Sequence, residues 1–166
     1  MKPKSKLLPR TPSESSVIMT ELVLPSHANV LGSIFGGTIM AWIDIAAAIA
    51  AGKHARSTVV TASIDALHFI APVRLGQVVH IHATVNRAFR TSMEVGVRVD
   101  AEDQITGEVT HTVTAYTTFV ALDENRKPRE VPPLEPQSPE EIRRYEEALK
   151  RKNSRVALAG ELKGKK

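Results

Sequence analysis

Apolar and polar residues alternate along much of the middle of the chain. From Met93 to Val99 every second residue is apolar, and Glu94 and Arg98 between them face the other way. A period of two is typical of a β-strand with one buried face. Short turn signals separate several such runs, which favours an antiparallel meander. Strands are predicted at residues 16–24, 57–70, 77–89, 92–102 and 108–122.

Residues 38–51 follow a different pattern, because they are apolar on every side. Alanine, isoleucine, methionine and tryptophan dominate, which is a helical composition, and Gly52 suits a C-terminal cap. A helix that is apolar all round belongs in a protein interior. The order of one strand, one buried helix and four strands predicts an α+β fold, with an antiparallel sheet wrapped around the helix.

The two ends of the chain read differently from its middle. Residues 1–13 are expected to form a flexible basic tail, and residues 14–127 the folded domain. Residues 128–166 are expected to hold a Pro-rich linker and a C-terminal helix that begins after Ser138. A frayed basic end is expected from Val156 onward.

Charge is concentrated in these ends. The net charge is +4, but residues 14–122 hold six basic and nine acidic groups. A mildly acidic body disfavours a nucleic-acid-binding surface. The chain has no cysteine, which excludes a disulfide scaffold and thiolate chemistry. Near the N-terminus, Leu7-Leu8 is too short for the apolar core of a signal peptide, and the longest apolar stretch, residues 39–51, is shorter than a membrane span. A soluble cytoplasmic protein is therefore expected.

One charged residue interrupts the most apolar part of the chain. Between Leu22 and Gly52, Asp44 is the only Asp, Glu, Lys or Arg in 31 positions. A carboxylate in apolar surroundings is costly, so either a local hydrogen-bond network satisfies it or it has a function.

The residues before this aspartate offer groups that bind a carbonyl oxygen. Gly36 and Gly37 stand at the expected helix start, where backbone N–H groups and the helix dipole favour an oxyanion. Asn29 adds an amide, and Asp44 adds a base or nucleophile. Together these groups predict acyl transfer to water, although tight helix–sheet packing would also explain the two glycines.

The string from Asn29 to Asp44, Asn-x-x-Gly-x-x-Phe-Gly-Gly-x-x-Met-x-Trp-x-Asp, resembles the acyl-CoA thioesterases of the hotdog fold. The likeness is strongest to the bacterial YciA type and to brain-type acyl-CoA hydrolases. It continues through residues 60–65, 69–76, 85–87, 90–95 and 119–123, and covers about residues 16–135.

This resemblance implies a hotdog fold, in which two subunits share a continuous sheet and the active site lies at their interface. Asn29 and Asp44 would then meet from opposite subunits, and three dimers would form a homohexamer. Asp44 would activate water or attack the thioester directly, while Asn29 and the Gly37 N–H bind the carbonyl. The general-base and covalent routes stay open. Acyl chain length is not predicted.

Coenzyme A is expected as part of the substrate, and no separate cofactor is expected. The sequence Arg90-Thr91-Ser92 at a turn, together with Ser63, is the candidate CoA contact. His80 and His82 share one strand face, but no third ligand stands out, so no metal site is predicted.

Two other functional classes fit parts of the sequence. A hydratase or dehydratase acting on acyl thioesters would need a histidine, for which His27 is the candidate. A non-catalytic module that binds acyl-CoA or RNA is the third hypothesis. RNA binding is disfavoured because the tails offer only Tyr145 as an aromatic residue.

Overall fold

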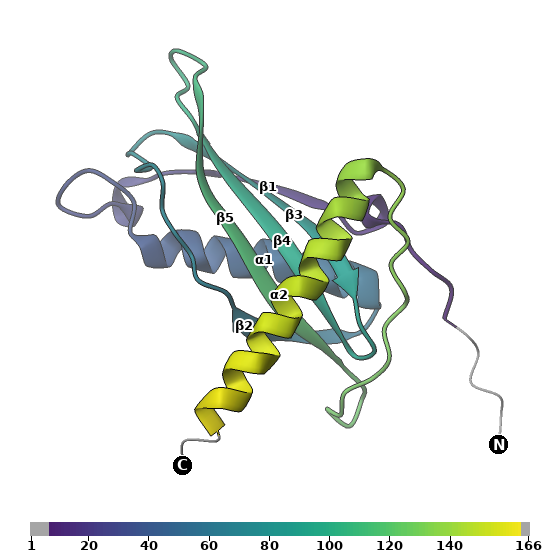
Figure 1. Cartoon of the computed structure of the whole chain (residues 1–166). Helices are drawn as coiled ribbons and strands as arrows, with labels where there is room; N and C mark the ends of the chain where they lie inside the picture. Colours follow the sequence, from purple (N-terminus) through teal and green to yellow (C-terminus); the bar gives the residue numbers. More distant parts are fainter. Residues whose placement is uncertain (1–6, 164–166) are drawn as a thin grey trace, which may run out of the picture.

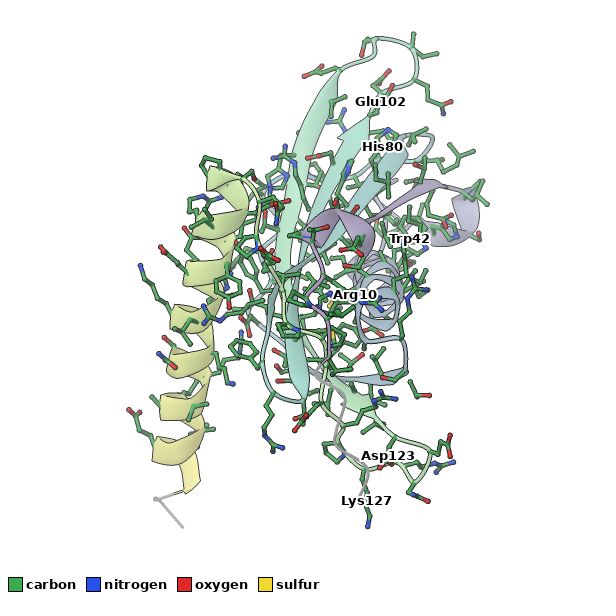
Figure 2. All side chains as sticks on the ribbon, turned by 90° about the vertical axis from the view of Figure 1, so that its right-hand side faces the viewer. Arg10, Trp42, His80, Glu102, Asp123 and Lys127 are labelled. Carbon is green, nitrogen blue, oxygen red and sulfur yellow. The ribbon has the colours of Figure 1, made fainter. Side chains whose placement is uncertain are left out.

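A computed structural model describes residues 7–163. Five strands form one antiparallel sheet in the order β1-β3-β4-β5-β2, with helix α1 on one face and helix α2 on the other (Figures 1 and 2). The predicted α+β architecture is therefore confirmed. The elements are β1 (Val17–Leu22), α1 (Gly36–Ala55), β2 (Thr58–Ile64), β3 (Val78–Ala88), β4 (Ser92–Glu102), β5 (Val109–Leu122) and α2 (Pro139–Lys163), with short 3-10 turns at Pro12–Glu14 and Pro25–His27.

The face of the sheet that covers α1 is almost wholly apolar. Alternate residues of β3, β4 and β5, among them Ile81, Val97 and Phe119, are buried against the helix. Four alanines of α1 have no exposed surface, and their small side chains let the helix lie close to the sheet: Ala46, Ala47, Ala50 and Ala51. The predicted period-two pattern thus marks the core face correctly.

The ends of several elements differ from their predicted positions. Gly52 lies inside α1 rather than capping it, because the helix continues to Ala55, whose side chain is buried. Arg56 ends the helix in the left-handed region, with φ at 49°, and its N–H bonds the Gly52 carbonyl. β2 stops at Ile64, six residues before the predicted end of that strand.

The chain ends are more ordered than the sequence suggested. Arg10 forms a bridge with Leu134, and its guanidinium donates to the Lys53 carbonyl (Figure 2 labels Arg10). α2 continues as a regular helix through Val156 to Lys163, where a frayed end was expected. Residues 1–6 and 164–166, which hold five of the seven basic residues of the predicted tails, lie outside the described residues.

Candidate active site

Asp44 lies half-buried on α1, between buried Ile43 and exposed Ile45, on a side of the helix within reach of edge strand β2. Its Oδ1 accepts a hydrogen bond of 2.7 Å from the Thr61 hydroxyl of β2. The pairing of β2 with β5 shifts register between Thr61 and Ser63, and this bulge lies next to the threonine that reaches the helix. The carboxylate is therefore held by one bond, and its remaining oxygen can accept a proton.

Asn29 organises the loop that leads into α1. Its Oδ1 accepts from the Leu31 N–H at 2.9 Å, while its Nδ2 lies 3.1 Å from the Ser33 hydroxyl. The backbone N–H of Asn29 donates to the Ser33 carbonyl, and Gly32 turns the chain with φ at 72°. The loop thus presents the amide at a defined position near the helix start.

One chain does not bring Asn29 and Asp44 into contact. The Asn29 loop precedes the first residue of α1, whereas Asp44 lies eight residues into the helix. At 1.5 Å per residue, the carboxylate is about 12 Å along the helix axis from its N-terminus. No hydrogen bond joins the two side chains within residues 7–163 of this subunit.

The two glycines at the helix start have different surroundings. A Cβ on Gly36 would lie 3.3 Å from the Phe69 ring, so this position needs a small residue for packing. A Cβ on Gly37 would meet nothing within 4 Å, and this residue is exposed. The N–H groups of the first helical turn have no partner within the helix. Gly37 therefore offers an accessible N–H donor, while Gly36 fits the packing interpretation.

The predicted CoA contacts separate into two groups. Ser63 and Ser92 line one cavity of about 870 Å³, together with Phe89 and residues 150–162 of α2. Arg90 and Thr91 are not among its lining residues. Their carbonyls instead accept from Val131 and Ala121, which ties the turn between β3 and β4 to neighbouring segments.

A buried ion-pair cluster holds α2 beside this cavity. Glu94 of β4 has no exposed surface, and its carboxylate accepts from Arg151 at 2.7 Å and from Arg155 at 3.3 Å. Arg155 also pairs with Asp65 at 2.6 Å. The Asn86 amide also donates to Oε1 of Glu94, while Oε2 accepts from the two arginines, so both carboxylate oxygens have partners. The sequence pattern did not predict that Glu94 anchors the C-terminal helix.

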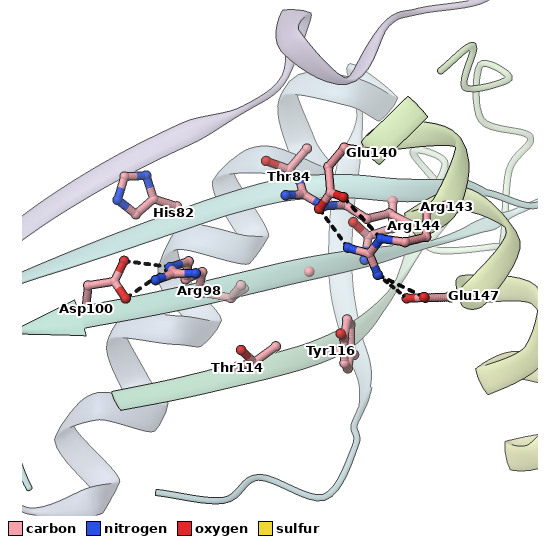
Figure 3. Close-up of a pocket in the computed structure, with 13 residues that line it drawn as sticks. His82, Thr84, Arg98, Asp100, Thr114, Tyr116, Glu140, Arg143, Arg144 and Glu147 are labelled. Atoms are coloured by element: carbon pink, nitrogen blue, oxygen red, sulfur yellow. Dashed lines mark hydrogen bonds and ion pairs between the residues drawn. The ribbon is translucent and has the colours of Figure 1, made fainter. Parts of the chain in front are cut away.

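A second hollow, of about 590 Å³, lies between the outer face of the sheet and the first half of α2 (Figure 3). Its charges neutralise one another: Arg143 pairs with Glu140 and Glu147, and Arg98 pairs with Asp100. These bonds raise the pKa of Arg143 and lower the pKa of Glu140.

His80 and His27 each have contacts of their own in the structure. His80 bonds Glu102 at 2.6 Å, and no group of three or more metal-ligating side chains gathers in the described part of the chain. His27 has structural contacts, since its Nδ1 accepts from the Leu24 N–H and its ring meets Trp42 edge-on at 5.2 Å. His27, the histidine that a hydratase would use, therefore has hydrogen-bond and ring contacts at the base of the Asn29 loop.

Thr61 is the residue of the candidate site that the sequence analysis did not predict. Its signal was present, because residues 60–65 belong to the stretch that resembles the thioesterases. An alternating strand contains many threonines, however, and only the fold shows which one faces the carboxylate.

Comparisons with known proteins identify the family of the chain. The sequence profile of the Thioesterase superfamily matches residues 31–108. An acyl-CoA thioester hydrolase of Bacillus subtilis, named YkhA and described as uncharacterized, is 40% identical over 142 residues, which cover 86% of this chain and 83% of the relative. Mouse acyl-coenzyme A thioesterase 11 is 42% identical over 147 residues, covering 87% of this chain. The matched region spans only 25% of that longer mouse protein.

Solved structures show the same fold. The acyl-CoA hydrolase of Staphylococcus aureus in complex with butyryl-coenzyme A and coenzyme A has a TM-score of 0.88 and 38% identity, covering 94% of this chain and 95% of that one. A hexameric acyl-CoA thioesterase has a TM-score of 0.89 and 46% identity, covering 92% and 98%.

The chain therefore belongs to the Thioesterase superfamily, as an acyl-CoA thioesterase of the hotdog fold. The resemblance found in the sequence is confirmed at this level, and so is acyl-CoA hydrolysis as the activity of the family. No helix among the described residues is long and apolar enough to span a membrane.

Proposed function

We propose that the protein hydrolyses acyl-CoA to coenzyme A and a free carboxylic acid, with Asp44 as the catalytic carboxylate. In the general-base route, Asp44 takes a proton from water while the water oxygen attacks the thioester carbon. The carbon–sulfur bond then breaks, and the CoA thiolate leaves and takes up a proton. In the covalent route, the Asp44 carboxylate attacks the thioester carbon, the carbon–sulfur bond breaks, and the CoA thiolate leaves and takes up a proton. Water then cleaves the resulting anhydride, which releases the carboxylic acid and restores the Asp44 carboxylate.

The observation that carries this proposal is the single carboxylate on the apolar outer side of α1, held by Thr61 at 2.7 Å. The Thr61 bond fixes the direction of one oxygen and leaves the other for water or substrate. Solved structures of the S. aureus hydrolase include alanine variants of an aspartate, an asparagine and a threonine. Asp44, Asn29 and Thr61 are the same three residue types, which supports their assignment to one site.

Carbonyl binding falls to Gly37 and Asn29. The accessible Gly37 N–H lies at the positive end of α1, and negative charge that develops on the thioester oxygen is stabilised there. The Asn29 Nδ2 supplies a second donor once it turns from Ser33 toward the substrate. Gly36 supports this site by allowing the close approach of Phe69.

A second copy of the chain completes the site. The outer side of α1 exposes Met40, Ile45 and Ile49 around Asp44, and β2 is an edge strand. An apolar surface beside an unpaired strand edge favours association through that edge. Because one chain leaves Asn29 and Asp44 apart, the partner's loop is the natural source of the asparagine. Hexameric relatives support a trimer of such dimers.

The CoA portion contacts Ser63, Ser92, Arg90 and Thr91 in this proposal. Ser63 and Ser92 share the cavity beside α2, while exposed Arg90 offers a cation at the adjacent turn. A cytoplasmic role in fatty acid metabolism fits this substrate. No cofactor enters the reaction, because coenzyme A arrives as part of the substrate.

The main experiment measures thiol release from a panel of acyl-CoAs. Asp44→Asn should lower kcat by about 10² or more, the usual contribution of a positioned general base. Asp103→Asn, which changes a carboxylate in the exposed β4–β5 turn, is the matched control and should keep full activity. Undiminished turnover in Asp44→Asn would remove Asp44 from the mechanism, and the absence of thiol release from every acyl-CoA would refute the hydrolase assignment.

A complementation experiment tests the shared site. Asn29→Ala and Asp44→Asn subunits are each expected to be inactive alone. Hybrid dimers hold one site with both native residues, so mixing should restore part of the activity. Complete inactivity after verified subunit exchange would show that the two residues do not act across the interface.

Sedimentation of the wild type should give six subunits.

A further inference from the structure

The cavity beside α2 contains positive charge that the catalytic proposal does not use. Four basic residues of α2 line it, and two of them are neutralised: Arg151 by Glu94, and Arg155 by Glu94 and Asp65. Lys150 and Lys152 flank Arg151, and no carboxylate pairs with either lysine among the described residues 7–163. The cavity therefore has two unpaired cations.

Lys152 lies in surroundings that favour an anion. Its ammonium nitrogen lies 3.7 Å from the centre of the Phe89 ring, and its neighbours Arg155 and Arg87 are cations. Burial, followed by repulsion from these two arginines, lowers the pKa of Lys152. A bound phosphate would offset both effects, because it supplies the missing negative charge and accepts charge-assisted hydrogen bonds.

The rest of the cavity suits the base and ribose of a nucleotide. Phe89, Ile64 and Leu158 give an apolar wall, while Ser63 and Ser92 supply hydroxyls. Thr118 also lines the cavity, and its buried hydroxyl has no hydrogen-bond partner in the described structure. An apolar surface with a few polar groups and a cationic rim is the usual composition of a site for a phosphorylated ligand.

We infer that Lys150 and Lys152 bind the 3′-phosphate at the nucleotide end of coenzyme A, and that they select phosphorylated CoA over its 3′-dephospho form. This inference rests on the proposed function for the identity of the ligand. The Glu94–Arg151–Arg155–Asp65 cluster contributes by fixing the turn of α2 that carries both lysines against the sheet. α2 is then one wall of the substrate site.

The test compares the Kd of CoA and of 3′-dephospho-CoA by titration calorimetry. Wild type should bind CoA at least about tenfold more tightly, which one charge-assisted hydrogen bond supplies. The Lys150→Gln/Lys152→Gln double variant should lose most of this preference. Lys150→Arg/Lys152→Arg, which keeps both charges, should retain it. Lys127→Gln is the matched control, because Lys127 lies in the turn after β5 and does not line the cavity (Figure 2).

Two results would overturn the inference. One is a double Gln variant with wild-type circular dichroism and an unchanged preference for CoA. The other is an equal loss of affinity for both compounds, which would move the lysines from the 3′-phosphate to the diphosphate. Because calorimetry needs no turnover, lysine-dependent CoA preference without thiol release would refute hydrolysis alone. Hydrolysis with an unchanged preference would refute the lysine assignment alone.

Discussion

Helices α1 and α2 lie on opposite faces of one sheet, and different interactions hold them there (Figure 2). α1 is held by apolar contact: its buried surface is mainly Ile, Trp and Ala, packed against valines of β3, β4 and β5. α2 is held mainly by charge, through Glu94 with two arginines and through Arg87, whose guanidinium lies 3.9 Å from the centre of the Tyr145 ring.

The difference shows where this fold can hold reactive and charged side chains. On the α1 face the core excludes charge, so Asp44 lies half-buried at the edge of that core, beside Thr61 of the edge strand β2. On the α2 face charged groups are part of the packing, and a cationic cavity forms beside the ion-pair cluster. In the proposed enzyme, the first face supplies the reacting carboxylate and the second supplies the groups that recognise the substrate.

Phe119→Ala should produce the largest loss of stability, because it leaves a cavity in the core between the sheet and α1. Phe119 is only 1% exposed and stands opposite Met93 in the β4–β5 pair. Removing a buried phenylalanine typically costs about 3–5 kcal/mol of unfolding free energy. Urea unfolding should show this loss as one cooperative transition. A loss below about 1 kcal/mol would contradict the close packing described for this face.

Glu94→Ala tests the charged side and should cost about 3 kcal/mol, the low end for breaking a buried pair. Arg151 and Arg155 keep 21% and 23% of their side-chain surface exposed, so water relieves part of the penalty. Hydrogen exchange should quicken in α2 while α1 stays protected. Equal acceleration in both helices would show that the two faces are not held independently.

A close glycine supports the same anchor. A Cβ on Gly96 would lie 2.6 Å from Nδ2 of Asn86, the amide that bonds Glu94. Gly96→Ala should therefore destabilise α2 as well, by less than Glu94→Ala, because the Asn86 side chain can rotate away. The exchange rates of α2 measure this directly, and unchanged protection would contradict the close approach.

The sequence predicted the face of α1 more completely than that of α2. Period-two apolar residues and a lone Asp44 are local signals, and a core that excludes charge makes such a carboxylate conspicuous. Glu94 stands in an ordinary alternating strand, 57 residues before Arg151, so its partner is visible only after folding. Thr61 could not be predicted for the same reason, since its contact with Asp44 depends on the position of an edge strand.

Helix ends were the least predictable feature of the fold. Gly52 is a good cap by residue type, yet burial of Ala55 and a bond from His54 Nε2 to the Pro132 carbonyl favour another turn of α1. α2 likewise remains helical to Lys163, beyond the expected fraying at Val156. Tertiary contacts around α1 outweigh the local cap preference there.

His54 adds a pH dependence to the α1 face. Burial lowers the pKa of this histidine, although its hydrogen bond to the Pro132 carbonyl acts in the opposite direction. Below its unfolded pKa of about 6.5, the unfolded chain takes up a proton that the folded chain does not. Stability should therefore fall as pH drops through about 6.5 toward the lower folded pKa.

Denaturant unfolding at several pH values between 5 and 8 measures this effect. His54→Gln should flatten the slope in that window, while His68→Gln, at an exposed position, should leave it unchanged. An identical slope in wild type and His54→Gln would assign the pH dependence to other groups.

Arg143→Ala should have the smallest effect on stability. It tests whether an exposed ion pair on α2 contributes as much as the buried Glu94 cluster does. Arg143 belongs to the charged helix, but its pairs with Glu140 and Glu147 are exposed rather than buried. Exposed pairs contribute little, since water and salt screen them. The variant should unfold at nearly the wild-type urea midpoint, and the small remaining difference should vanish in about 1 M salt, where the screening length is near 3 Å. A midpoint shift as large as that of Glu94→Ala would mean that charge alone, without burial, holds α2. A negligible shift assigns the anchor to Glu94, the carboxylate of this interface that has no exposed surface.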